Sequence, residues 1–161
     1  MEKKQSNPSS NHRELPADFL EQFHHSADLQ IRFNDVDRLD HVNNSIFQQF
    51  FDLGRLRYFE ELLKPKMQWD SVVVVVARIE IDFIAPLHLE DTPAVATRVH
   101  SIKPKTFHMQ QAIYDPKTRL VYAVADSLMV GFDTQQNKSH ELLDSWVEAM
   151  ERFEAQGKPI V

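Results

Sequence analysis

The chain has 161 residues, of which 42% are hydrophobic, and it carries a net charge of −6. This length favours one domain with a full core, and the acidic balance argues against a nucleic-acid partner, because phosphate contacts need a basic surface. The absence of cysteine excludes disulfides, thiol nucleophiles and thiolate metal sites. The three glycines are too far apart for a dinucleotide-binding loop, a P-loop or a serine-hydrolase elbow.

Residues 1–24 are predicted to form a flexible leader, within which residues 16–24 have the composition for one or two helical turns. Residues 25–161 are predicted to form a single domain. The charged start lacks the apolar segment of a signal peptide, and the chain has no apolar run near the about 20 residues of a spanning helix. We therefore expect a cytoplasmic protein without membrane contact.

The first half of the domain is predicted to be one strand and one long helix. Residues 27–33 alternate apolar and polar side chains, which indicates a half-buried strand that ends at Asn34. Residues 43–63 have apolar side chains at three- and four-residue spacing in two adjacent stripes, one of which includes Leu56. Gly54 should weaken this helix by about 1 kcal/mol relative to alanine, so we expect a neighbouring backbone to pass close to it.

The ends of this helix and the rest of the chain carry further signals. Asn43 or Asn44 is predicted to cap the helix, and Pro65 to end it. Four strands are predicted after it, and Ser139 is predicted to cap a C-terminal helix; the strands are 72–84, 93–102, 106–114 and 120–132. The order predicts an α+β fold, in which a five-stranded antiparallel sheet wraps around the long central helix.

Polar residues gather in the turn before the long helix, and six of them fall within ten positions: Asp35, Asp37, Asp40, His41, Asn43 and Asn44. Asp and Asn are also the residues of ordinary turns and caps, and composition alone favours that interpretation. A helix N-terminus, however, can polarise a carbonyl, and a carboxylate in the preceding turn can act as nucleophile or as general base for water. Together they suit carbonyl hydrolysis.

Residues 36–44, VDRLDHVNN, resemble the D-x-x-G-H-V-N-N signature of the hot-dog acyl-CoA thioesterases, in the 4-hydroxybenzoyl-CoA thioesterase-like group. The resemblance continues through IEIDFIAPLHLED, residues 79–91, and covers roughly residues 29–133. It implies a hot-dog fold and hydrolysis of an acyl-CoA thioester to a free acid and coenzyme A. It implies no cofactor, because coenzyme A enters as part of the substrate.

The resemblance also implies roles for four residues of the turn. Asp37 matches the acid that attacks the thioester or activates water, and the backbone amide of Asn44 matches the group that polarises its carbonyl. His41 and Asn43 match positioning groups.

This chain departs from the signature at three positions. Asp40 stands in place of the signature glycine, Glu90 in place of a later turn glycine, and Phe47 where relatives often carry tyrosine. None of these departures removes Asp37.

Other residues are predicted to bind substrate or to have no special role. The outer edge of the aromatic stripe with Phe47 and Phe51 is expected to line an acyl pocket. A second group is expected to meet the coenzyme A phosphates, although an ordinary solvated surface fits these residues equally well: Arg98, Lys103, Lys105 and Thr106. The histidines, His88 among them, fall in no metal-binding spacing, so we expect no metal site and surface histidines instead.

Two alternatives for the function stay open. Acyl carrier protein, rather than coenzyme A, could carry the acyl group. The chain could also be a non-catalytic acyl-CoA-binding domain, for which Asp40 in the signature loop is the main argument. For assembly, the resemblance implies a homodimer or a dimer of dimers with the site at the interface, and an open antiparallel sheet has an edge to protect.

Overall fold

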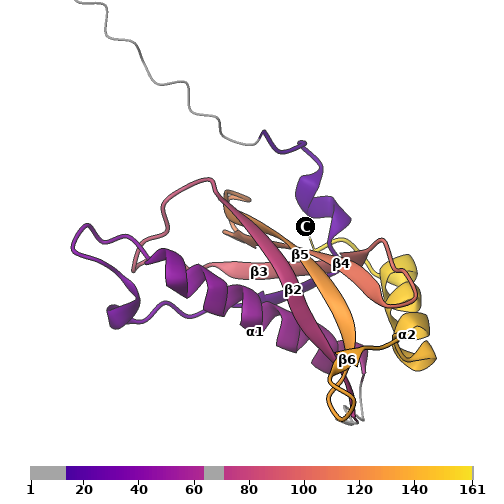
Figure 1. Cartoon of the computed structure of the whole chain (residues 1–161). Helices are drawn as coiled ribbons and strands as arrows, with labels where there is room; N and C mark the ends of the chain where they lie inside the picture. Colours follow the sequence, from indigo (N-terminus) through magenta and orange to yellow (C-terminus); the bar gives the residue numbers. More distant parts are fainter. Residues whose placement is uncertain (1–13, 64–70, 161) are drawn as a thin grey trace, which may run out of the picture.

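The computed structural model describes residues 14–63 and 71–160, and the predicted stop at Pro65 lies outside them. A curled antiparallel sheet with one long helix on its inner face forms the body of the protein (Figure 1). The elements in chain order are η1 (Phe19–Gln22), β1 (His25–Asp28), η2 (Phe33–Asp35), α1 (Asn44–Leu62), β2 (Val72–Phe83), β3 (Ala94–His100), β4 (Thr106–Tyr114), β5 (Val121–Asp133), β6 (Lys138–Ser139) and α2 (Asp144–Gln156). The predicted α+β architecture is confirmed.

The strands are ordered β1-β3-β4-β5-β2, and the two-residue β6 pairs with β5 beside this path. β2 is therefore an edge strand, although it is one of the longest. This explains why its valines are less buried than their sequence suggests: Val75 is 37% exposed and Val76 is 40% exposed. The register of β2 on β5 also shifts between Val76 and Arg78, which is a β-bulge.

The main core lies between α1 and the inner face of the sheet. It joins the aromatic stripe of α1 to alternate residues of the central strands, namely Phe47, Phe50, Phe51, Val95, Ile113, Ala123 and Ala125. Burying each large apolar side chain contributes about 1.5–3 kcal/mol. The two-stripe prediction was wrong for Leu56, which is 41% exposed, because α1 presents that position to solvent.

Gly54 lies where α1 approaches β3 and β4 most closely. A Cβ atom at this position would stand 2.7 Å from Nε2 of Gln111 and 2.8 Å from Cγ2 of Val95. The close neighbours are thus side chains, and the prediction of a nearby backbone was wrong. The buried Gln111 amide donates from Nε2 to the carbonyl of Phe51, at 2.9 Å, and to the hydroxyl of Thr97, at 3.1 Å.

Other elements cover the outer face of the sheet, opposite α1. Phe19, Leu20 and Phe23, on and beside η1, are buried against the outer-face residues of β3, β4 and β5. η1 confirms the predicted helical turn within residues 16–24. Residues 1–13 of the predicted leader lie outside the described part of the chain.

Two predicted boundaries were wrong. The first strand ends at Asp28, not at Asn34, because Asp35 and Arg32 close a 3-10 turn that takes the chain away from the sheet and leaves Phe33 79% exposed. Ser139 does not cap the last helix. It pairs with Phe132 of β5, and α2 begins five residues later with Leu143 at its N-cap. Within the described residues, no helix is long and apolar enough to cross a membrane.

Candidate active site

The loop before α1 is held by a buried carboxylate. Asp35 accepts hydrogen bonds from the backbone N–H of Arg32, at 2.8 Å, and from its guanidinium, at 2.9 and 3.2 Å. Burial acts to raise the pKa of Asp35, but the hydrogen bonds from Arg32 outweigh it and the pKa lies below its ordinary value. The carbonyl of Asp35 accepts from the backbone and side-chain N–H groups of Asn43, at 2.9 and 3.2 Å. Asp35 therefore fixes both ends of the loop.

Asp37 closes the tip of the same loop. Its Oδ1 accepts the backbone N–H groups of Leu39, at 2.7 Å, and His41, at 3.1 Å, while its own N–H donates to the carbonyl of His41, at 2.8 Å. The hydrogen bonds from His41 and Leu39 hold the pKa of this exposed carboxyl below its ordinary value. Asp37 is therefore an anion at neutral pH, in the loop that precedes α1.

Asp40 adopts the left-handed backbone conformation in this loop, with φ of 60°. Glycine adopts this conformation without strain, whereas other residues are strained in it, and Asp and Asn are strained least. The loop thus keeps the shape that a glycine would allow, although the residue is Asp. The carboxylate of Asp40 lies 3.4 Å from the backbone N–H of Leu89, in the turn after β2.

The N-terminus of α1 has no side-chain cap. Asn43 occupies the N-cap position, as the sequence predicted, but its amide donates to the carbonyl of Asp35 instead of accepting from the helix. The prediction that its side chain caps the helix was therefore wrong. In the first turn the N–H of Ile46 donates to the carbonyl of Asn43, at 2.9 Å, so the N–H groups of Asn44 and Ser45, with the positive end of the helix dipole, are the ones that can face a ligand on this side.

A cavity of about 220 Å³ opens at this helix start. The first residue of α1, the signature loop and the segment after β2 line it together: His41, Val42, Asn44, Phe47, Phe83, Ile84, Ala85, Pro86 and Leu87. Phe47 and Phe83 meet edge to face, with ring centroids 5.2 Å apart. One end of the cavity thus carries polar groups and a helix N-terminus, and its walls are apolar. This arrangement suits a polarised carbonyl attached to an apolar chain.

The family model described as the thioesterase-like superfamily matches residues 31–150, which include the signature loop, α1 and the whole sheet except β1. This chain belongs to the thioesterase-like superfamily. Comparison with functionally curated proteins gave no match.

Solved structures show the same fold. A thioesterase from Thermus thermophilus, complexed with coenzyme A and zinc, is 25% identical, with 84% of this chain and 98% of that chain covered and a TM-score of 0.73. YbaW, a probable thioesterase from Escherichia coli, is 22% identical over 80% and 98% of the two chains, with a TM-score of 0.70. A protein from Staphylococcus aureus in complex with coenzyme A is 12% identical over 88% and 89%, with a TM-score of 0.75. The fold of this thioesterase-like protein is the hot-dog fold.

The structure brings together some of the predicted site residues of this thioesterase-like protein. His41, Asn44 and Phe47 line the cavity, and Asn43 holds the loop. Asp37 lies in the same loop, but within the described chain it does not line the cavity. Phe51 is completely buried in the main core.

The predicted phosphate-binding residues lie elsewhere in the chain. Arg98, on the outer face, stacks over the ring of Phe23 at 5.4 Å and donates to Gln110 at 2.9 Å, and its burial lowers its pKa. Lys103 and Lys105 flank the turn after β3, and the backbone N–H of Thr106 donates to the carbonyl of Lys103. This turn lies near the C-terminal end of α1, because Ile102 packs in one cluster with Tyr58 and Leu62, whereas the cavity lies at the other end of that 19-residue helix.

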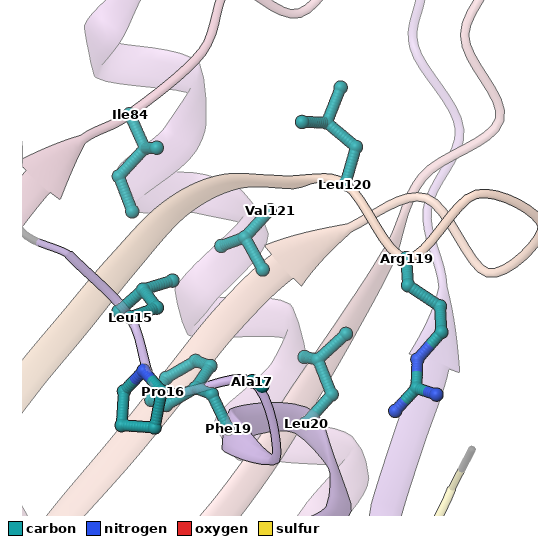
Figure 2. A pocket seen from close by; sticks show the side chains of 9 residues that line it. All are labelled: Leu15, Pro16, Ala17, Phe19, Leu20, Ile84, Arg119, Leu120 and Val121. Carbon is teal, nitrogen blue, oxygen red and sulfur yellow. The ribbon is translucent and has the colours of Figure 1, made fainter.

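A second cavity, of about 290 Å³, lies over the outer face. Figure 2 shows its lining, in which Leu15, Pro16, Phe19 and Leu20 face Val121 of β5 and Ile84. Arg119 stands at its rim, where its guanidinium lies 3.4 Å from the carboxylate of Glu21. None of the predicted site residues lines this second cavity. Among the described residues, no group of three or more His, Asp or Glu side chains is placed to hold a metal ion.

Sequence reasoning missed the contribution of the segment after β2. Phe83, Leu87 and their neighbours form one wall of the cavity, and His88 contacts His41, with ring centroids 5.2 Å apart. The signal for this wall was the IEIDFIAPLHLED segment, which carried the resemblance but was interpreted as strand and turn alone. His88 in particular was interpreted as an ordinary surface histidine.

Proposed function

We propose that this chain is an acyl-CoA thioesterase, which hydrolyses a thioester to a free acid and coenzyme A without a further cofactor. Asp37 acts as nucleophile or as general base for water, and the backbone amide of Asn44 donates to the developing oxyanion. His41 and Asn43 orient the loop and the substrate. The cytoplasmic location expected from the sequence is part of this proposal.

One observation carries the proposal: the uncapped start of α1 opens on the same cavity as His41, directly after a loop that keeps Asp37 anionic. An oxygen of the thioester carbonyl placed at the helix N-terminus would meet amide donors as negative charge develops on it. The apolar walls around Phe47 and Phe83 suit the acyl chain. Hydrolysis forms a C–O bond, breaks the C–S bond and returns a proton to the departing sulfur.

The test is thiol release from a panel of acyl-CoA substrates by the wild type and by Asp37→Asn. Asn retains an oxygen that can accept the N–H groups of Leu39 and His41, so the loop should keep its shape while the anion is lost. We expect turnover to fall by about 10²-fold or more, with an unchanged melting temperature. Equal turnover of the two proteins would remove Asp37 from the mechanism.

Coenzyme A, rather than acyl carrier protein, is the proposed acyl carrier. The Thermus thermophilus thioesterase and the Staphylococcus aureus protein were both solved with coenzyme A, which supports this choice. Competition between acyl-CoA and acyl carrier protein substrates at equal concentration would decide it. Preferential hydrolysis of the carrier-protein substrate would contradict the choice of donor but leave the site intact.

The non-catalytic alternative rested on Asp40. Asp40 adopts a left-handed conformation, which a glycine at this position would also allow, so the replacement of the signature glycine need not change the loop backbone. This supports an active enzyme. Tight acyl-CoA binding by the wild type without release of thiol would instead establish a binding domain.

We also propose that two copies pair through β2, alone or as a dimer of dimers. Within the described chain β2 pairs with β5 on one side only, and Val75 and Val76 of β2 are exposed. Soluble proteins rarely leave an apolar edge strand of this kind open to solvent. Phe83, the last residue of β2, lines the cavity, so a second copy on this edge would border the site. Val75→Lys should convert dimers to monomers in sedimentation velocity. A wild type that sediments as a monomer at every concentration would refute the pairing.

A further inference from the structure

Residues 40–42 of the signature loop run antiparallel to residues 87–89, in the turn after β2. The backbone N–H of Val42 donates to the carbonyl of Leu87 at 2.8 Å. Two residues away, the N–H of Leu89 lies 3.4 Å from the Asp40 carboxylate. The first contact is a backbone hydrogen bond and the second is made by a side chain, and together they bring the middle residues of the two segments close to each other. His41 must therefore lie opposite a residue 47 positions later in the chain.

That residue is His88. The imidazole rings of His41 and His88 meet edge to face, with centroids 5.2 Å apart and an interplanar angle of 66°. This is the geometry that aromatic pairs prefer over a face-to-face stack. His41 lines the 220 Å³ cavity, whereas His88 does not, so His88 contacts His41 without lining the cavity itself.

His88 is itself held from its own turn. Its backbone N–H donates to Oδ2 of Asp91 at 2.8 Å, and Nδ1 of its ring lies 3.5 Å from the same oxygen. The side chains of His88 and Asp91 are 41% and 31% exposed, so both remain partly covered by the turn. Asp91 thus contacts His88, and His88 contacts His41, so that a chain of contacts leads from the turn after β2 to the cavity.

We propose that His88 is a positioning residue, which holds the imidazole of His41 in one orientation at the cavity. This inference rests on the proposed function and deepens it, because it assigns a role to a residue outside the signature. A solvent-exposed imidazole samples several rotamers, and a ring packed against it restricts them. A side chain that is already oriented loses less conformational entropy on reaching the transition state, so the reaction is faster. Asp91 in turn limits the freedom of His88.

The decisive variants are His88→Ala and His88→Phe. Alanine removes the ring against His41, whereas phenylalanine keeps an aromatic edge or face there and loses only the contact of Nδ1 with Asp91. We expect kcat/KM for the best acyl-CoA to fall about tenfold in His88→Ala, mainly through kcat, and to return to within about twofold of the wild type in His88→Phe. His140→Ala, which removes a histidine side chain far from the cavity, is the matched control.

A second measurement does not depend on activity. The ring currents of His88 act on the imidazole protons of His41, so the His41 ring signals in a ¹H–¹³C NMR spectrum should move in His88→Ala and move less in His88→Phe. Asp91→Asn, which keeps an oxygen for the His88 backbone N–H, provides a milder variant if His88→Ala does not fold.

The outcomes separate this inference from the proposed function. Wild-type kcat, KM and His41 ring signals in His88→Ala would overturn the positioning role while leaving the thioesterase intact. A wild type without turnover on any acyl-CoA would overturn the proposed function, and with it a role of His88 in that reaction. A rate loss that phenylalanine does not rescue would also overturn ring packing as the way in which His88 acts.

Discussion

The hydroxyl of Tyr58, in α1, donates a 2.6 Å hydrogen bond to Oε1 of Glu154, in α2. The same carboxylate oxygen accepts the backbone N–H of Val99, at 2.7 Å, from β3. Tyr58 is completely buried, and burial together with the neighbouring carboxylate raises its pKa far above the ordinary value. One acidic side chain therefore joins α1 and α2 to the sheet, and Tyr58 is a neutral donor at neutral pH.

Tyr58→Phe should destabilise the protein by about 1.5–3 kcal/mol, because it removes a hydrogen bond to a charged group in a buried place. The ring packing against His25, Phe59 and Phe153 is retained, so the loss reports the hydroxyl. Urea unfolding measures it. Tyr114→Phe is the matched control, since that hydroxyl lies 3.0 Å from the hydroxyl of Ser26 and a neutral bond contributes about 1 kcal/mol. Equal losses in the two variants would show that the hydrogen bond to Glu154 is no stronger than the one between Tyr114 and Ser26.

Asn44→Pro should abolish most turnover while keeping the helix. Proline is tolerated at the first helical position, and the preceding Asn43 already has the extended conformation that proline requires, with φ of −61° and ψ of 141°. The substitution removes the backbone N–H proposed as oxyanion donor, which should lower kcat by about 10²–10³-fold. Asn44→Ala keeps this N–H and should keep most activity. Similar rates for the two variants would point to a different donor.

Asp40 should accept glycine but not a β-branched residue. At a φ of 60°, valine costs about 1–2 kcal/mol more than glycine, and it also loses the contact with Leu89. We expect thermal unfolding of Asp40→Gly near that of the wild type and a clearly lower melting temperature for Asp40→Val. Arg38→Val, in the same loop but without a left-handed backbone, is the control. If both valine variants melt alike, the conformation of residue 40 is not the cause.

The ion pair between Arg32 and Asp35 predicts acid sensitivity. The pKa of Asp35 is lower in the folded protein than its ordinary value of 3.8, so the unfolded chain binds more protons as the pH falls. This stabilisation is fully present above the ordinary value and is lost as the pH drops through the folded value. Asp35→Asn should be less stable than the wild type near pH 7, and the difference should shrink towards about pH 3. Urea unfolding at both pH values tests this, and a constant difference would contradict it.

Local periodicity made most of the fold predictable. The alternation in residues 106–114 and the three- and four-residue spacing in residues 44–62 act within one element, and both elements lie where the sequence placed them. The end of the first strand was not predictable in this way, since alternation continues to Phe33 although the Arg32–Asp35 turn removes these residues from the sheet. Apolar pattern also overestimated the burial of β2, because it does not reveal which strand lies at an edge.

For the site, the signature loop identified one wall of the cavity but not the other. His41 and Asn44 are neighbours in sequence, and their proximity needs no knowledge of the sheet. The contact of His41 with His88 depends instead on the pairing of Val42 with Leu87, which only the folded chain establishes. The resemblance assigns the basic residues near the turn after β3 to the site, but within this chain they lie towards the other end of α1.

The buried amide of Gln111 determines where α1 can lie along the sheet. Its two donors are satisfied by Phe51 of the helix and Thr97 of β3, inside a core that offers few other acceptors. If α1 slid by one turn, about 5.4 Å, the amide would keep Thr97 but lose the carbonyl of Phe51, and a large side chain would replace Gly54 beside Nε2, where a Cβ atom alone would stand only 2.7 Å away. The contact with Gln111 near the middle of α1 therefore also fixes the position of its first turn. The direction in which the amide groups of that turn point thus depends on a glutamine across the core.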